Sequence, residues 1–248
     1  MYQDYNEYEK FYQTNLGKNI KYLISSQLKK YIYLYDGDRV GCFGFSHNYL
    51  DNVKSERIEI FNCFSEKIGT KKNFENNRSV NILLEEDRLP IEDLFLNHIL
   101  SIHYLENSNN LKKTLREFWR VLSPEGKAYL ILPNKKSSWS HSSQSPFASG
   151  FGFSKKQISR FLEDNFFEIQ FIERLVYFPP WDYKLILNNK FFFEKMGSYF
   201  WRLLNGVYLC VIKKRIYATP TKRSLSFSEK IRVIKTHQKL EYLSSKRE

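Results

Sequence analysis

The chain has 248 residues, of which 42% are hydrophobic and 17% aromatic, so it is not wholly disordered and is long enough to bury one full core. Its formal net charge is +12. No uncharged apolar stretch reaches the roughly 18 residues that span a bilayer, and the polar, acidic start MYQDYNEYEK does not have the pattern of a signal peptide.

The first half of the chain alternates helical and strand-like patterns. Apolar residues at helical spacing predict a helix over residues 16–33, and Asp36-Gly37-Asp38 predicts a turn. An apolar run from Arg39 predicts a first strand that breaks into a loop near Gly44. Three more strand-like runs follow, at residues 56–64, 79–87 and 94–106.

The second half continues the alternation. It begins with an amphipathic helix over residues 109–122, which Pro124 and Gly126 are expected to stop. The later elements are a strand at 126–134, a loop at 135–153, a helix at 155–165 capped by Ser154, a strand at 166–178, a helical segment at 190–204 and a strand at 205–218.

This order predicts an α/β fold with a Rossmann-like, seven-stranded, mostly parallel sheet, helices on both faces and a C-terminal antiparallel hairpin. Ligands bind such sheets beyond the carboxyl ends of the strands, where the loop at 43–49 should lie. We expect one domain over residues 1–218 and a basic, partly disordered tail over 219–248.

The three cysteines, Cys42, Cys63 and Cys210, show no pair at metal-ligand spacing, so we predict no metal site. They fit a reducing cytoplasm. Residues 213–248 hold eleven basic and three acidic residues, which is +8 of the +12. This segment is either a solvated end that aids solubility or a site that attracts the phosphates of nucleic acid or anionic lipid.

Four segments resemble a known family. They are RVGCFGFSHNYL in the place of a glycine-rich loop, NILLEEDRLPIED, ILSIHYLEN with LKKTLREFWRVLSPEGKAYLILPN, and EKMGSYFWRLLNGVYLCVIKKRIYA. Together they resemble a class I S-adenosylmethionine-dependent methyltransferase of the bacterial type 11 group. The resemblance spans about residues 16–218.

The resemblance implies S-adenosylmethionine as the cofactor and assigns residues to it. The loop residues that would wrap its methionine end are Phe43, Gly44, Phe45 and Ser46, and the acids nearest its ribose and adenine are Glu66, Glu85 and Glu86. The loop departs from the family pattern, since Ser46 and Asn48 replace two glycines and Cys42 replaces an acid.

On the acceptor side, two histidines are the candidate catalytic residues. The resemblance places His103 at the end of the fourth strand, facing the cofactor or the acceptor, although a structural histidine at a helix start is an equal alternative. His141 is a candidate general base in the 135–153 loop. Aromatic side chains in and after this loop either line an acceptor pocket or pack within the loop; they are Trp139, Phe147, Phe153, Phe178 and Trp181.

Three functions follow from these observations. The first is a methyltransferase acting on a small-molecule acceptor. The second is a methyltransferase-like protein without catalysis that serves binding or assembly, which the altered loop favours. The third is methylation associated with RNA, which the basic tail favours.

Overall fold

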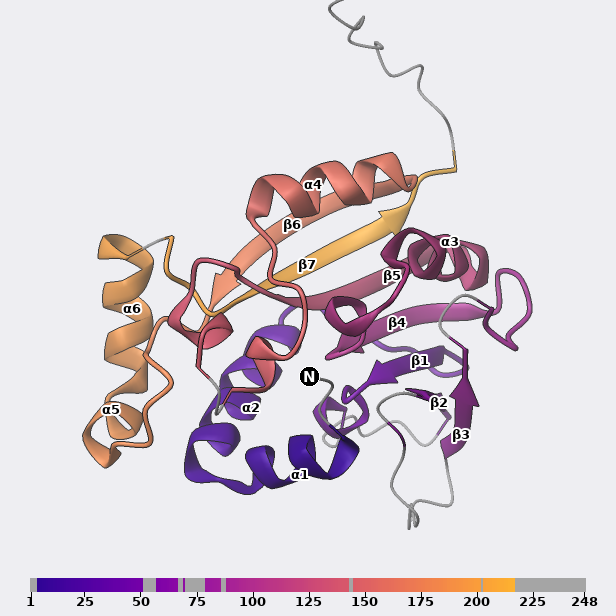
Figure 1. The fold of residues 1–248 in the computed structure, drawn as a ribbon. Coiled ribbons are helices and arrows are strands. Elements are labelled where there is room, and N and C mark those ends of the chain that lie inside the picture. The colour runs from indigo at the N-terminus through magenta and orange to yellow at the C-terminus, as the bar shows by residue number, and fades with distance from the viewer. Residues whose placement is uncertain are drawn as a thin grey trace, which may run out of the picture. The chain divides into compact units, whose positions relative to one another are not determined.

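Seven strands form one sheet in the order β3-β2-β1-β4-β5-β7-β6 in the computed structural model, which describes residues 4–50, 57–66, 69, 79–85, 88–142, 145–201 and 203–216 (Figure 1). The strands are β1 (Arg39–Gly44), β2 (Glu59–Ser65), β3 (Ser79–Leu84), β4 (Leu96–Ile102), β5 (Leu122–Pro133), β6 (Phe167–Leu175) and β7 (Val207–Lys214). The helices are α1 (Tyr5–Gln13), α2 (Asn15–Leu28), α3 (Leu111–Val121), α4 (Lys155–Asp164), α5 (Lys184–Asn188) and α6 (Lys190–Phe200).

The first five strands pair in parallel, and β7 lies antiparallel between β5 and β6. The chain order reverses beside β1, because β2 and β4 flank it on opposite sides. A parallel sheet binds ligands at such a reversal, beyond the carboxyl ends of its strands. The predicted fold class, including the antiparallel C-terminal pair, is confirmed.

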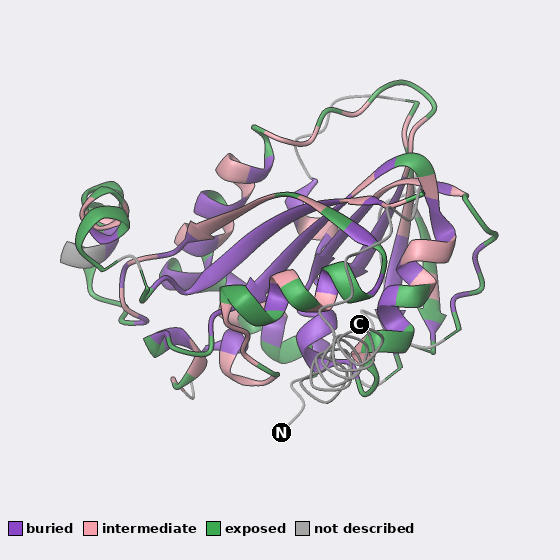
Figure 2. Ribbon diagram, turned by 90° about the horizontal axis from the view of Figure 1, so that it is seen from above, coloured by how far each residue is buried: buried purple, intermediate pink, exposed green. Residues whose placement is uncertain are grey.

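Helices cover both faces of the sheet, as Figure 1 shows. Successive side chains of a strand point to opposite faces, and β1 follows this rule. Cys42 belongs to the core beneath α1 and α2, whereas Phe43 belongs to the core beneath α3 and α4. The strands at the centre of the sheet are coloured as buried in Figure 2.

The predicted stop after α3 takes a different form from the expected turn. The helix ends at Val121, but the chain runs directly into β5. Leu122 pairs with Leu96, and the next paired residue of β5 is Lys127, opposite His98. Residues 123–126 therefore bulge out of the ladder as part of the strand. Pro124 explains the helix end, since proline pushes the residue before it out of the helical region.

The N-terminal region holds one helix more than the sequence patterns predicted. The helix expected over 16–33 is α2, which ends at Leu28 and begins where the side chain of Thr14 accepts from the N–H of Gly17. The additional helix, α1, precedes it. The predicted cap at Ser154 is confirmed, because Ser154 and Gln157 form a reciprocal capping box.

The predicted boundary at 218 with the basic tail 219–248 lies outside the described residues; the domain described here ends at Arg215. None of the described helices is long and apolar enough to cross a membrane.

Candidate functional site

The loop after β1 turns at Gly44, whose φ is +71°. A Cβ atom at this position would lie 2.3 Å from the carbonyl oxygen of Ile102, at the end of β4. Glycine is therefore required here for two reasons, the left-handed backbone and the close approach of β1 to β4. Neither reason involves a ligand.

The two phenylalanines beside Gly44 point to opposite faces of the sheet. The ring of Phe43 packs on Tyr104 and Phe118, with centroids 5.3 and 4.5 Å apart. Phe45 lies on the α1 side, where its ring stacks on Tyr12 at 5.0 Å. Only the second of the two side chains therefore faces the place where the sequence predicts a cofactor.

A row of tyrosines on α1 closes over this loop. Tyr5, Tyr8 and Tyr12 share one helical face and are all buried. The ring centroid of Phe45 lies 5.3 Å from that of Tyr5 and 5.8 Å from that of Tyr8. This row was not predicted from the sequence, although tyrosines three and four residues apart are a helical signal.

His103 lies at the end of β4, fully buried, with a φ of +57°. Its Nε2 is 2.8 Å from the hydroxyl oxygen of Tyr12, and its Nδ1 is 3.1 Å from a carboxylate oxygen of the buried Glu106. A carboxylate accepts, so Nδ1 carries the proton and Nε2 accepts from Tyr12. The result is a buried Tyr12–His103–Glu106 chain.

Further contacts hold this chain between α1 and the sheet. The ring of Tyr8 stacks on His103 with centroids 4.7 Å apart. The side-chain amide of Asn107 donates to the hydroxyl of Tyr8 at 3.1 Å and to the carbonyl oxygen of His103 at 3.2 Å. Burial raises the pKa of Tyr8 to about 12, so its hydroxyl stays neutral. Glu106 and both tyrosines were not predicted as site residues.

His141 lies in a different environment. Its side chain is exposed, and its Nδ1 donates to the carbonyl oxygen of Ser137 at 2.8 Å, within its own loop. His103 instead contacts α1 and Phe147, whose ring centroid lies 4.8 Å away. None of the described contacts brings the two histidines together.

Two aromatic side chains of the 135–153 loop, Trp139 and Phe147, pack against each other, whereas Phe153 packs on the core beneath α3 and α4. Trp139 is buried, its ring lies 6.1 Å from Phe147 and 5.6 Å from Phe178, and its Nε1–H donates to the carbonyl oxygen of Phe178. Trp181 is exposed. Of the two alternatives for these residues, the structure has the one in which the loop buries its own rings.

The comparisons agree with this fold. Residues 39–130 match the family model of a methyltransferase domain. A chain of the complex between the Haloferax volcanii Trm112 methyltransferase activator and a methyltransferase has a TM-score of 0.62 at 16% identity, over 86% of this chain and 97% of that one. The fold is that of the class I S-adenosylmethionine-dependent methyltransferases.

Two further methyltransferase structures are similar. An S-adenosylmethionine-dependent methyltransferase from Thermotoga maritima has a TM-score of 0.59 at 14% identity, over 85% of this chain and 95% of its own. One from Aquifex aeolicus has a TM-score of 0.57 at 13% identity, over 86% and 99%. Among curated proteins, none matches this sequence.

The sequence predicts S-adenosylmethionine as the cofactor, and the similar proteins from Thermotoga maritima and Aquifex aeolicus are methyltransferases that depend on it. The residues around the β1 loop do not fit its methionine end in the arrangement shown. Phe45 is 3% exposed, and Ser46 and His103 are fully buried, so their side chains leave almost no surface that a ligand could contact. The tyrosine row of α1 occupies that volume.

The acids assigned to the adenosine end follow β2 and β3, the two outermost strands on one side of the sheet. Glu66 follows the last residue of β2 and is exposed. Glu85 follows β3, is also exposed, and forms a short bridge with Arg88. Glu86 lies outside the described residues. The roles of these acids in cofactor binding remain predictions, as do those of the loop residues and the two histidines.

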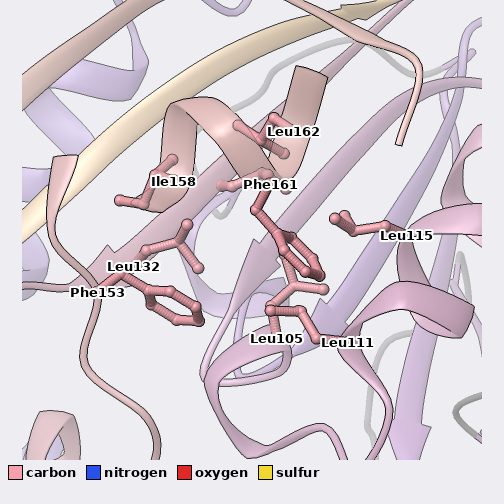
Figure 3. A pocket seen from close by; sticks show the side chains of 9 residues that line it. Leu105, Leu111, Leu115, Leu132, Phe153, Ile158, Phe161 and Leu162 are labelled. Carbon is pink, nitrogen blue, oxygen red and sulfur yellow. The ribbon is translucent and has the colours of Figure 1, made fainter. Parts of the chain in front are cut away.

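A hollow between α3 and α4 does not serve as an alternative site (Figure 3). Nine apolar side chains line it, among them Leu105, Phe153 and Phe161. A sulfonium and an amino acid group need polar or charged partners when they leave water. The hollow offers none from its side chains, so it is a packing gap of the methyltransferase core.

Proposed function

We propose that the protein is an S-adenosylmethionine-dependent methyltransferase for a small-molecule acceptor, and that α1 must move away from the β1 loop before the cofactor binds. The observation that carries the proposal is the buried Tyr12–His103–Glu106 chain beside Gly44, at the carboxyl end of β4. A buried site beneath a helix favours a small acceptor over a macromolecule.

His103 has the surroundings of a general base. Glu106 accepts from Nδ1 and so leaves the lone pair of Nε2 directed at the hydroxyl of Tyr12. When Tyr12 withdraws with α1, Nε2 is free to accept a proton from an acceptor hydroxyl or amine. His141 keeps its role as a second candidate base, because its Nε2 has no part in the hydrogen bond to Ser137.

The closed loop also favours a second function, that of a methyltransferase-like protein that binds or assembles without catalysis. The two functions differ in whether opening α1 creates a cofactor site. A cytoplasmic location belongs to the proposal as well, since Cys42, Cys63 and Cys210 are all free and buried.

Calorimetric titration with S-adenosylmethionine tests the proposal. The double substitution Tyr8→Ala and Tyr12→Ala weakens the closed arrangement, so it should tighten binding by roughly tenfold or more, because apparent affinity scales with the population of the open state. Tyr33→Ala with Tyr35→Ala, at exposed positions, is the matched control and should leave affinity unchanged. If neither the wild type nor the tyrosine variant binds, the methyltransferase proposal is wrong.

Turnover measurements then separate the roles of the histidines. His103→Ala should lower the rate of methyl transfer much more than it lowers cofactor affinity, because a base acts on the acceptor. The same comparison applies to His141→Ala. An equal loss of rate and affinity in either variant would contradict its role as a base.

A further inference from the structure

The outward side of α6 and the turn after it carry an unusual density of exposed apolar side chains. We call them the α6 apolar face: Phe191, Phe192, Tyr199, Phe200, Trp201, Leu203 and Leu204. Each of them is between 50% and 80% exposed. Single exposed apolar residues are common on soluble proteins, but a group of this kind along one short segment marks an interaction surface.

The helix that presents this face is firmly attached by its other side. The carboxylate of Glu194 accepts from the N–H groups of Val176 and Tyr177, at 3.2 and 2.6 Å. Gly197 packs against the side chain of Tyr177 so closely that a Cβ at Gly197 would lie 2.3 Å from the Cβ of Tyr177. Phe193 packs on the core beneath α1 and α2. The opposite side of this helix is exposed.

Lysines accompany these aromatic side chains. Lys184 and Lys195 are exposed, and Nζ of Lys190 lies 4.8 Å from the ring centroid of Tyr22 and 5.4 Å from that of Phe191. The sequence from residue 183 to 201 contains a single acid, Glu194, which is used to anchor the helix. This segment thus combines exposed aromatic rings with three lysines and one acid.

We propose that the α6 apolar face docks the protein reversibly on an anionic lipid surface. Phenyl, phenol and indole rings favour the boundary between headgroups and acyl chains, and lysines reach the phosphates above it. The eleven residues of α6 rise by roughly 16 Å, about half of a bilayer core, so the helix lies in the interface and does not span it.

Two other occupants fit this surface less well. The cores of protein–protein interfaces are depleted in lysine, whereas Lys184 and Lys190 precede this face and Lys195 lies within it. A second copy of the chain would bring two positively charged faces together, and like charges across an interface are costly. The net charge of +12 favours an anionic surface in the same way.

Vesicle co-sedimentation of the full chain tests the proposal. The vesicles consist of phosphatidylcholine, with or without phosphatidylglycerol. The wild type should bind the anionic vesicles and bind the neutral ones more weakly. The triple substitution Phe192→Ser, Tyr199→Ser and Phe200→Ser should lower binding to anionic vesicles by roughly tenfold or more, since it removes most of the apolar area available for insertion.

Matched controls distinguish vesicle binding through this face from nonspecific binding through other exposed aromatic or basic residues. Tyr33→Ser, Tyr35→Ser and Phe151→Ser remove three exposed aromatic rings elsewhere and should leave vesicle binding unchanged. Lys184→Gln with Lys195→Gln should reduce it, and Lys112→Gln with Lys156→Gln should not. Circular dichroism and melting temperature verify that each variant is folded.

The outcomes that overturn the proposal are distinct. If the triple variant binds anionic vesicles as well as the wild type does, the basic segment at 213–248 binds the lipid and the α6 apolar face does not. Sedimentation velocity measures whether a second copy binds the face instead. If the wild type is a dimer, the triple variant is a monomer and neither binds vesicles, the face is assigned to a second copy. Wild-type protein that stays monomeric and binds no vesicles also refutes the proposal.

Discussion

The hydroxyl oxygen of Tyr12, on the first helix, lies 2.8 Å from Nε2 of His103, at the end of the fourth strand. Both side chains are buried, and 91 residues of sequence separate them. This hydrogen bond joins the N-terminal helix to the place where methyltransferase folds bind their ligands. It accounts for the closed state of the β1 loop.

Tyr12→Phe tests how much this bond contributes. The substitution keeps the ring that stacks on Phe45 but removes the donor to His103, which leaves a buried acceptor unsatisfied. We expect the free energy of unfolding in urea to fall by roughly 1–3 kcal/mol. Tyr22→Phe, at an exposed position, is the control. Equal stability of Tyr12→Phe and the wild type would show that the bond does not hold α1 closed.

The strands and the fold class could be predicted because each strand is a continuous apolar run between turn residues, and because strand–helix alternation admits few topologies. The amphipathic pattern of residues 109–122 likewise predicted α3 to within about two residues at its ends. These signals are local. They depend on which residues are buried and not on what the residues are buried against.

The closed site could not be predicted for the same reason. The sequence places Phe45 in a loop that should leave room for a ligand, and nothing local shows that Tyr12 stacks on its ring. Glu106 was treated as an end-of-strand acid, since its contact with His103 depends on the left-handed backbone at position 103. Packing between distant segments decides the site, and periodicity does not reveal it.

Gly44→Ala tests the close approach of β1 and β4. A methyl group would lie 2.3 Å from the carbonyl oxygen of Ile102, at a φ of +71°. Gly37 has a similar φ of +88° but open space around it, so Gly37→Ala measures the backbone strain alone. We expect roughly 1–3 kcal/mol of lost unfolding free energy at position 37 and a clearly larger loss at position 44. Equal losses in urea unfolding would contradict the steric contact.

Arg120 links α3 to the segment that follows the third strand. Its guanidinium donates to the carboxylate of Glu117 and to the carbonyl oxygens of Leu89 and Ile91. Lysine cannot reproduce this planar set of donors. Arg120→Lys should therefore lower the free energy of unfolding by roughly 1.5–3 kcal/mol, as measured in urea. Arg160→Lys, in an exposed pair with Asp164, should change it by less than about 0.5 kcal/mol.

Glu194 gives the protein a pH-dependent stability with a defined sign. Burial raises the pKa of this carboxyl to about 7, against the lowering effect of the N–H groups of Val176 and Tyr177. Between pH 4.5, which is the ordinary pKa of the carboxyl, and about pH 7, the unfolded chain loses this proton while the folded chain keeps it. The stability that Glu194 contributes is therefore fully present below pH 4.5 and is lost as the pH rises through 7. The free energy of unfolding falls by roughly 1–3 kcal/mol over this range.

Glu194→Gln removes the titrating group and keeps one acceptor oxygen, which can serve one of the two N–H groups that Glu194 accepts from. The fall in melting temperature between pH 5 and pH 7.5 should be smaller in this variant than in the wild type, so that the difference in stability between the two shifts in favour of the variant as the pH rises. Glu163→Gln, at an exposed position of α4, should follow the wild-type curve. Parallel curves for Glu194→Gln and the wild type would show that α6 is anchored by an already ionised carboxylate, because a group charged in both states contributes no slope in this window.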